Sequence, residues 1–102
     1  MCEQKVSRRV VVNNPQGLHA RPADQFARLA VRFEAHIELV KNGMRVDGKS
    51  VLNLLTLAAV QGTELLLEAQ GPDAREALDA LAELVEKDFS EEENEISGQQ
   101  ST

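Results

Sequence analysis

The stretch that decides the fold is Gly17-Leu18-His19-Ala20-Arg21-Pro22-Ala23. Before it, Val6, Val10 and Val12 fall on one side of an alternating pattern, which predicts a strand with one apolar face. After it, the apolar residues from 20 to about 32 recur at intervals of three and four, which predicts a helix. Pro22 falls in the first helical turn, where a missing N–H costs little. Residues 17–23 therefore mark the junction between a strand and a helix.

A hairpin is expected after this helix. Residues 36–41 alternate, with Ile37 and Leu39 pointing one way, and residues 44–47 form the expected return strand. The dipeptide between them, Asn42-Gly43, is the strongest short signal of a hairpin turn because both residues tolerate positive φ.

The second half of the chain adds a short helix, a strand and a long helix. The short helix is expected to begin at Ser50, and residues 63–70 are expected to form the fourth strand. Asp73 is expected to cap the long helix, with Glu76 three residues on as in a capping box. The resulting order, β-α-β-β-α-β-α, predicts an α+β fold: an open-faced two-layer β-sandwich, with helices on one face of an antiparallel sheet.

The composition indicates one domain in a reducing compartment. The 102 residues are divided into a domain, 1–89, and an acidic tail, 90–102, which we expect to be disordered. Cys2 is the single cysteine, so no intrachain disulfide is possible. No stretch has the apolar length of a membrane span, so we expect a soluble, cytoplasmic protein without membrane insertion.

The formal net charge of −6 argues against nucleic acid as a partner. The charge is uneven, because residues 1–49 carry a balance of +4 and residues 50–102 a balance of −10. RNA-recognition domains share this order of elements but need stacking aromatics on the sheet and a basic surface. The predicted strand at 44–47 has no aromatic residue, so that interpretation is poor.

His19 is the candidate reactive residue. It stands where a helix begins, and backbone N–H groups and the positive end of the helix dipole favour an anion there. Imidazole is substantially neutral and nucleophilic near pH 7. A phosphoryl group on the ring would meet the N–H groups of Ala20 and Arg21 and the guanidinium of Arg21. The pattern indicates a phosphate-carrying site that needs no cofactor and no metal.

Residues 17–23, preceded by Asn14, resemble the active-site signature of the histidine-containing phosphocarrier protein HPr family of the bacterial phosphotransferase system. Gly48-Lys49-Ser50-Val51-Leu52 resembles the start of the same family's second helix, and the similarity runs from about Val6 to Asp88. The resemblance implies a sheet in order 1-4-2-3 under three helices. It also implies a relay in which Enzyme I donates a phosphoryl group and the IIA units of sugar permeases accept it.

By this resemblance, His19 is the phosphoacceptor through Nδ1 and Arg21 is its cationic partner. Ser50 matches a serine that some bacteria phosphorylate from ATP, which would make a serine kinase a further partner. Ser50 is also a plausible helix N-cap, and that role needs no kinase. His36 lies in no motif and is interpreted as a structural strand residue.

Two surfaces are candidates for docking of partner proteins. On the first helix, Arg21, Gln25, Arg28 and Arg32 form a polar stripe, which is either a solvated face or a strip for acidic partners. The short helix is apolar on nearly all sides, and a helix over a sheet buries only one stripe. Val51, Leu52 and Leu55 are therefore expected to include an exposed patch that partners contact.

Two alternative functions remain open, both for a protein expected to be a monomer. One is a regulatory HPr paralogue of the nitrogen-related branch, which does not feed sugar transport. The other is a regulatory binding module that keeps the fold without transferring phosphate, and the presence of His19 argues against it.

Overall fold

A computed structural model describes residues 5–87, which form seven elements in the predicted order. These elements are β1 (Lys5–Val11), α1 (Ala20–Ala30), β2 (His36–Lys41), β3 (Met44–Asp47), α2 (Val51–Thr56), β4 (Glu64–Gln70) and α3 (Ala74–Glu86). The domain boundary at residue 89 and the tail 90–102 lie outside the described residues.

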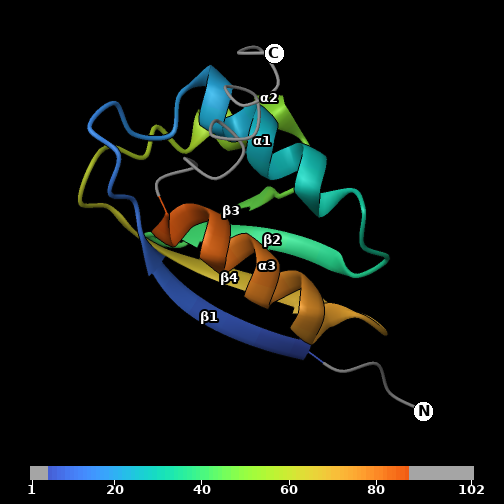
Figure 1. The fold of residues 1–102 in the computed structure, drawn as a ribbon. Helices are drawn as coiled ribbons and strands as arrows, with labels where there is room; N and C mark the ends of the chain where they lie inside the picture. Colours follow the sequence, from blue (N-terminus) through green and yellow to red (C-terminus); the bar gives the residue numbers. More distant parts are fainter. Residues whose placement is uncertain (1–4, 88–102) are drawn as a thin grey trace.

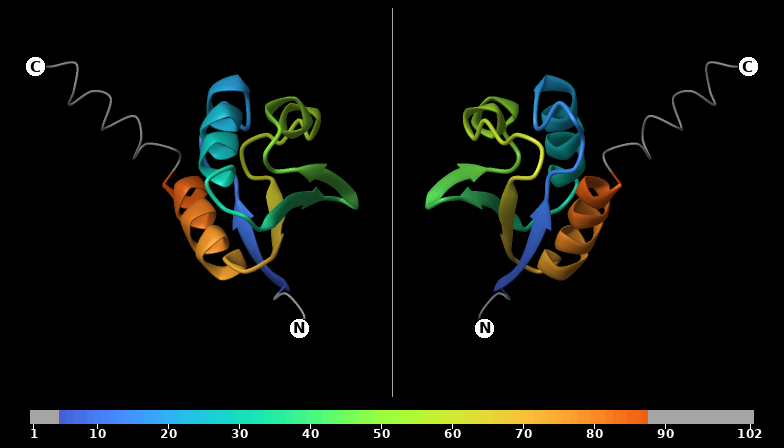
Figure 2. Two further views of the ribbon diagram at one scale, coloured as in Figure 1. Left: turned by 90° about the vertical axis from the view of Figure 1, so that its right-hand side faces the viewer. Right: turned by 90° about the vertical axis from the view of Figure 1, so that its left-hand side faces the viewer.

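The four strands form one antiparallel sheet in the order β1-β4-β2-β3, as expected (Figure 1). The strand pairing places Leu67 of β4 opposite Leu39 of β2, and Leu39 opposite Val46 of β3. Directly opposite residues of antiparallel strands share a face, so these apolar side chains line one side of the sheet. All three helices cover that side, and the other side is open (Figure 2).

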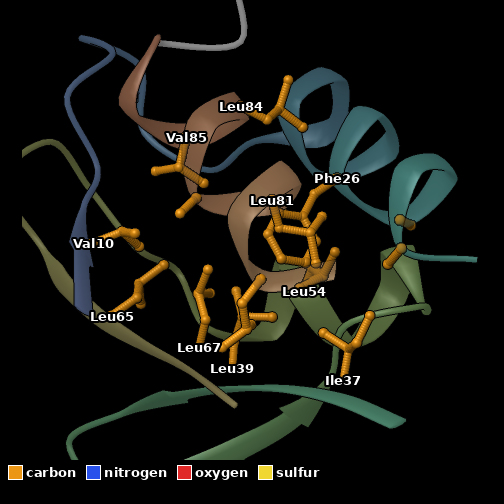
Figure 3. Close-up of a cluster of buried hydrophobic side chains, with 14 of the residues drawn as sticks. Val10, Phe26, Ile37, Leu39, Leu54, Leu65, Leu67, Leu81, Leu84 and Val85 are labelled. Carbon is orange, nitrogen blue, oxygen red and sulfur yellow. The ribbon is translucent and has the colours of Figure 1, made fainter. Parts of the chain in front are cut away.

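The core lies between the helices and the covered face of the sheet. Phe26 of α1 and Leu81 of α3 pack above Leu39 and Leu67 (Figure 3). Phe26 is fully buried, and the remaining buried hydrophobic residues of the core are aliphatic, as the low aromatic content indicates. The apolar residues whose spacing predicts the first helix, Ala23, Phe26, Ala27 and Ala30, are buried in the structure.

The ends of the long helices differ from the sequence prediction. Helix α1 ends at Ala30, about two residues early, and Arg32 N donates to Leu29 O in the turn that follows. Asp73 does occupy the N-cap of α3, but its side chain makes no capping bond, so the predicted capping box is wrong. Its carboxylate instead accepts the N–H groups of Glu34 (2.9 Å) and Ala35 (2.8 Å). These bonds, the one from Glu34 first, lower the pKa of Asp73 and fix the start of β2 against the start of α3.

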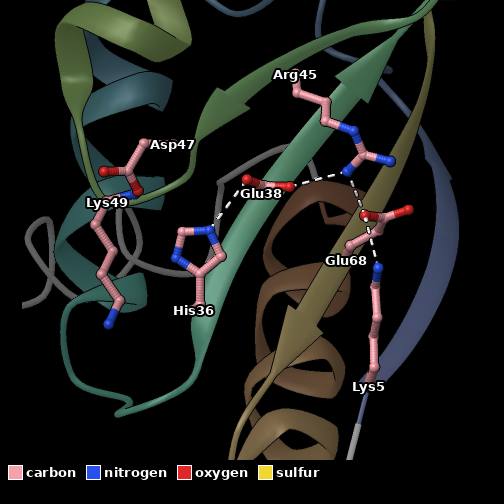
Figure 4. Close-up of polar contacts among 7 residues, drawn as sticks. All are labelled: Lys5, His36, Glu38, Arg45, Asp47, Lys49 and Glu68. Carbon is pink, nitrogen blue, oxygen red and sulfur yellow. Dashed lines mark hydrogen bonds and ion pairs between the residues drawn. The ribbon is translucent and has the colours of Figure 1, made fainter.

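The open face of the sheet carries a network of charged side chains (Figure 4). Arg45 of β3 donates to Glu38 of β2 at 2.9 Å and to Glu68 of β4. His36 lies 3.0 Å from the other oxygen of Glu38, and this hydrogen bond is the largest cause of the lowered pKa of that carboxyl. Exposed pairs of this kind contribute little to stability. His36 begins β2, as predicted, and it is exposed.

Candidate functional site

The loop between β1 and α1 is held by its own hydrogen bonds and by a second loop. Asn14 O accepts Gly17 N at 3.0 Å, and Asn14 Nδ2 donates to Gly17 O at 2.6 Å. Leu18 N donates to Ala59 O at 2.8 Å, and the Leu18 side chain is buried. The residue before His19 is therefore fixed both to the core and to the segment after α2.

Gly17 allows the two loops to approach closely. Its φ is +74°, and a Cβ built on it would lie 2.5 Å from Ala59 O and 2.9 Å from Val60 Cα. A side chain at this position would both strain the backbone and separate the loops.

His19 is the N-cap residue of α1, with extended backbone at φ −95° and ψ −165°. Its carbonyl accepts the N–H of Ala23 at 3.0 Å. The N–H groups of Ala20 and Arg21 precede this first helical hydrogen bond, and Pro22 has no N–H. The imidazole makes no capping hydrogen bond, and His19 as a residue is half-buried and lines an open hollow. The ring therefore lies at the positive end of a helix and reaches solvent.

A shallow hollow of about 280 Å³ lies beside the ring. It is lined by Asn14, Pro15, Gln16, His19, Arg21, Pro22 and Gln25. The structure thus brings His19 and Arg21 together at one surface depression, as the sequence predicts. Its open shape and the cationic side chain of Arg21 in its lining suit a small anion attached to the ring.

The predicted polar stripe on α1 is wrong at two positions, because Gln25 is buried and Arg32 lies in the turn after the helix. Gln25 is 6% exposed and lines the hollow, whereas Arg28 and Arg32 are exposed. The side-chain oxygens of Gln25 and Asn14 are buried and accept no hydrogen bond within residues 5–87. Sequence reasoning did not assign Gln25 to the site, although it follows Arg21 by one helical turn. Arg28 donates to Asp24 on its own helix at 2.8 Å.

Helix α2 lies beside α1 (Figures 1 and 2). Ser50 is its N-cap, as predicted, because Oγ accepts Asn53 N at 3.3 Å. Val51 and Leu55 are half-buried against the core, whereas Leu52 is 76% exposed. The expected apolar exposure on this helix is therefore present.

Two classes of site are absent from the described part of the chain. Residues 5–87 contain no cluster of three or more His, Cys, Asp or Glu side chains that could hold a metal ion. Within the same residues, no helix has the length and apolarity to cross a membrane.

Comparison with known protein families shows one match over nearly all of the described residues. The family model for the PTS HPr component phosphorylation site covers residues 6–87. Phosphocarrier protein HPr of Neisseria meningitidis is 40% identical over 84 residues, which are 82% of this chain and 94% of that protein. Phosphocarrier protein NPr of Shewanella violacea is 41% identical over 87 residues, or 85% of this chain and 96% of that protein.

Solved structures agree with these sequence matches. The crystal structure of HPr from Bacillus anthracis has a TM-score of 0.76 at 42% identity, covering 79% of this chain and 96% of that one. An HPr dimer from Thermoanaerobacter tengcongensis has a TM-score of 0.67 at 38% identity, covering 78% of this chain and 92% of that one. The sheet order and helix placement described above are therefore those of a known fold.

Proposed function

This chain belongs to the HPr family of phosphocarriers of the bacterial phosphotransferase system, and we propose that it accepts a phosphoryl group on His19 from phosphorylated Enzyme I and passes it to IIA units of sugar permeases. One observation carries the proposal: His19 is the N-cap of α1, is half-buried and lines an open surface hollow. A partner's histidine can reach such a ring, and a phosphoryl group on it would lie at the positive end of the helix.

The proposed transfer needs no catalytic base. Neutral His19 attacks phosphorus through Nδ1, so that the Nδ1–P bond forms as the N–P bond to the donor histidine breaks. The acceptor then reverses these roles. Phosphoryl transfers have loose transition states, in which positioning and charge stabilisation supply most of the rate. The amides of Ala20 and Arg21 and the guanidinium of Arg21 would supply that charge, without a cofactor or metal.

A carrier must also release its phosphoryl group. A deeply buried phosphate would be held strongly, because charges attract more in a medium of low dielectric constant. The exposed Arg21 and the open hollow beside His19 keep the site in contact with water. The phosphoryl group is therefore expected to be held weakly enough for onward transfer.

The proposed docking surface for Enzyme I and the IIA units includes Arg28 of α1 and the Val51, Leu52 and Leu55 side chains of α2. Leu52 supports this assignment because a side chain that is 76% exposed adds little to the core. We expect Leu52→Ala to slow transfer from Enzyme I and to IIA units without changing stability. Unchanged transfer would remove Leu52 from the docking surface.

Ser50 is the proposed regulatory site. A phosphate on its Oγ would lie at the beginning of α2, where negative charge is favourable, and beside the proposed docking surface. A serine kinase that uses ATP would be the partner. Incubation with such a kinase should label the wild-type chain and leave Ser50→Ala unlabelled.

The regulatory alternative has a specific observation in its favour. The chain is as similar to the NPr of S. violacea, at 41% identity, as it is to the HPr of N. meningitidis, at 40%. Transfer to IIA proteins of sugar permeases, tested beside those of the nitrogen-related branch, would separate the two roles. We propose a monomer as the transferring unit and the cytoplasm as its compartment, and sedimentation of the phosphorylated chain would test the former.

The deciding experiment is incubation with phosphoenolpyruvate and Enzyme I. The expected product is an acid-labile, alkali-stable phosphoprotein with the phosphate on His19. His19→Ala should fold normally and stay unphosphorylated, and Arg21→Ala should be phosphorylated more slowly. Full phosphorylation of the histidine variant would end the proposal.

A further inference from the structure

Lys41, the last residue of β2, reaches across to the end of another element. Its Nζ donates to Leu57 O at 2.8 Å and lies 3.4 Å from Ala58 O. The first carbonyl belongs to the C-cap residue of α2 and the second to the residue after it, and the last turn of α2 contains no basic residue of its own. A cation is favourable there because the last carbonyls of a helix lack partners and carry the negative end of the dipole. Lys41 therefore caps α2 from outside the helix.

The segment that Lys41 holds has an unusual backbone. Ala58 follows the C-cap residue Leu57 and has a φ of +51°. This left-handed conformation is common for glycine and uncommon for a residue with a Cβ. Helices often end with one residue in this conformation, and the hydrogen bond from Ala58 N to Leu55 O at 3.2 Å supports it here, but an alanine at this position depends more than a glycine on its surroundings. The nearby hydrogen bonds from Lys41 to the carbonyls of Leu57 and Ala58 are suited to holding that conformation.

The next residue connects this segment to the site. Ala59 O accepts the N–H of Leu18 at 2.8 Å, and Gly17 packs directly against the Ala59–Val60 backbone. The conformation of Ala58 sets the direction of the Ala59 carbonyl. That carbonyl in turn fixes Leu18, the residue before the N-cap His19.

We propose that Lys41 is a positioning residue for His19, acting through Ala58, Ala59 and Leu18. The proposal rests on the proposed function, in which His19 carries the phosphoryl group. Lys41 does not line the hollow beside His19, and its hydrogen bonds go to the segment after α2, so it is not a catalytic residue. Its role is to hold the loop that presents the imidazole.

Lys41→Met in the full-length chain tests the proposal, because methionine keeps an apolar stem and removes the donor. Three quantities are measured: hydrogen exchange of the Leu18 amide, the rate of phosphorylation by Enzyme I, and the urea midpoint. We expect faster exchange at Leu18 and roughly a 3- to 30-fold lower maximal rate, since a displacement below 1 Å already weakens a near-attack geometry. The Enzyme I concentration at half-maximal rate should stay within about two-fold, because Lys41 is outside the proposed docking surface.

Lys49→Met is the matched control. Lys49 is also half-buried and its Nζ also donates to a backbone carbonyl, that of Phe33 at 2.7 Å, but not to the segment after α2. We expect it to lower the urea midpoint by a similar amount while leaving Leu18 exchange and the transfer rate unchanged. An equal loss of rate in both variants would mean that general stability, and not positioning, controls transfer, and would overturn the proposal.

Two rescues separate positioning from stability alone. Lys41→Arg keeps donors in reach of both carbonyls and should restore the rate. Ala58→Gly, introduced into Lys41→Met, should also restore it because glycine adopts the left-handed conformation without strain. If the double variant keeps the low rate of Lys41→Met, the route through Ala58 is wrong. Should Lys41→Met not fold, Lys41→Gln takes its place in every arm, including the rescue.

The exchange measurement keeps this proposal distinct from the proposed function. If the wild-type chain is not phosphorylated on His19, the proposed function is wrong. That result leaves the structural link from Lys41 to the loop untouched, because only unchanged Leu18 exchange in Lys41→Met refutes that link. If phosphorylation occurs and Lys41→Met alters neither exchange nor rate, the function stands and the positioning role is refuted.

Discussion

Gly17→Ala is expected to damage the site from a position that contributes no side chain. The residue has a φ of +74°, which costs an L-residue about 1–2 kcal/mol. The new Cβ would also lie 2.5 Å from Ala59 O, an atom of the backbone that cannot rotate away. Non-bonded heavy atoms prefer a separation of about 3.5 Å, so the two loops must move apart by about 1 Å to make room for the new Cβ.

The size of the effect follows from three contributions. The strain of about 1–2 kcal/mol adds to an overpacking cost of about 1–3 kcal/mol. Alanine also lowers the conformational entropy of the unfolded chain, which raises the unfolding free energy by about 0.4–1 kcal/mol. The net loss of unfolding free energy therefore falls between about 1 and 5 kcal/mol, with a middle value of about 3 kcal/mol, which corresponds to a fall in Tm of roughly 12–24 °C for a domain of this size.

Gly62→Ala is the control, since Gly62 has a φ of +90° but open space around its Cβ position. It carries the strain without the clash, so its expected cost is only about 1 kcal/mol. Urea unfolding at constant m-value measures both variants, and phosphorylation by Enzyme I measures the site. A displacement of about 1 Å should lower the rate roughly 10- to 100-fold in Gly17→Ala alone. Equal stabilities and equal rates in the two variants would refute the argument from close approach.

Three shorter predictions concern stability. Asp73→Asn should weaken the link between α3 and β2. Because the pKa of Asp73 in the folded protein is lowered from 3.8, the carboxylate stabilises the fold above pH 3.8, and this stabilisation is lost as the pH falls through the folded pKa. The unfolding free energies of the wild type and the variant should therefore converge in acid. Ser50→Ala should cost about 0.5–2 kcal/mol in urea unfolding, since it removes the N-cap of α2, and a cost near zero would contradict that role. Leu67→Ala should cost about 2–5 kcal/mol, because Leu67 is fully buried at the centre of the sheet, and a smaller loss would show that the core closes around the cavity.

The elements of the fold follow from local signals in the sequence. Asn42-Gly43 predicts the hairpin because its turn needs two positive φ angles, and the structure has +49° and +85° there. The junction at residues 17–23 is equally local, since the change of hydrophobic period and Pro22 both mark the start of α1. The N-cap role of Ser50 is also local, because its side chain bonds to the backbone only three residues away.

The errors arise where a tertiary contact competes with a local one. Asp73 has the spacing of a capping box with Glu76, yet its carboxylate serves two amides some 38 residues away in sequence. Gln25 has the spacing of a solvated stripe, yet it is buried and lines the same hollow as residues of the β1–α1 loop. Periodicity describes one element at a time, so it does not reveal which loop will cover a helix face.

The contacts that hold His19 in place belong to the same class. Gly17 is recognisable in the sequence as a turn residue, but the reason that only glycine fits is the backbone of Ala59, more than forty residues later. Lys41 is an ordinary strand end in the sequence, and its bonds to Leu57 and Ala58 exist only once β2 and α2 have packed. The proposed role of His19 requires a ring that partner proteins can reach and that is nevertheless held in place. The ring of His19 can be reached because it lies at the start of a helix, and the sequence predicts that position. The ring is held in place by the segment after α2, and no sequence pattern connects that segment to His19.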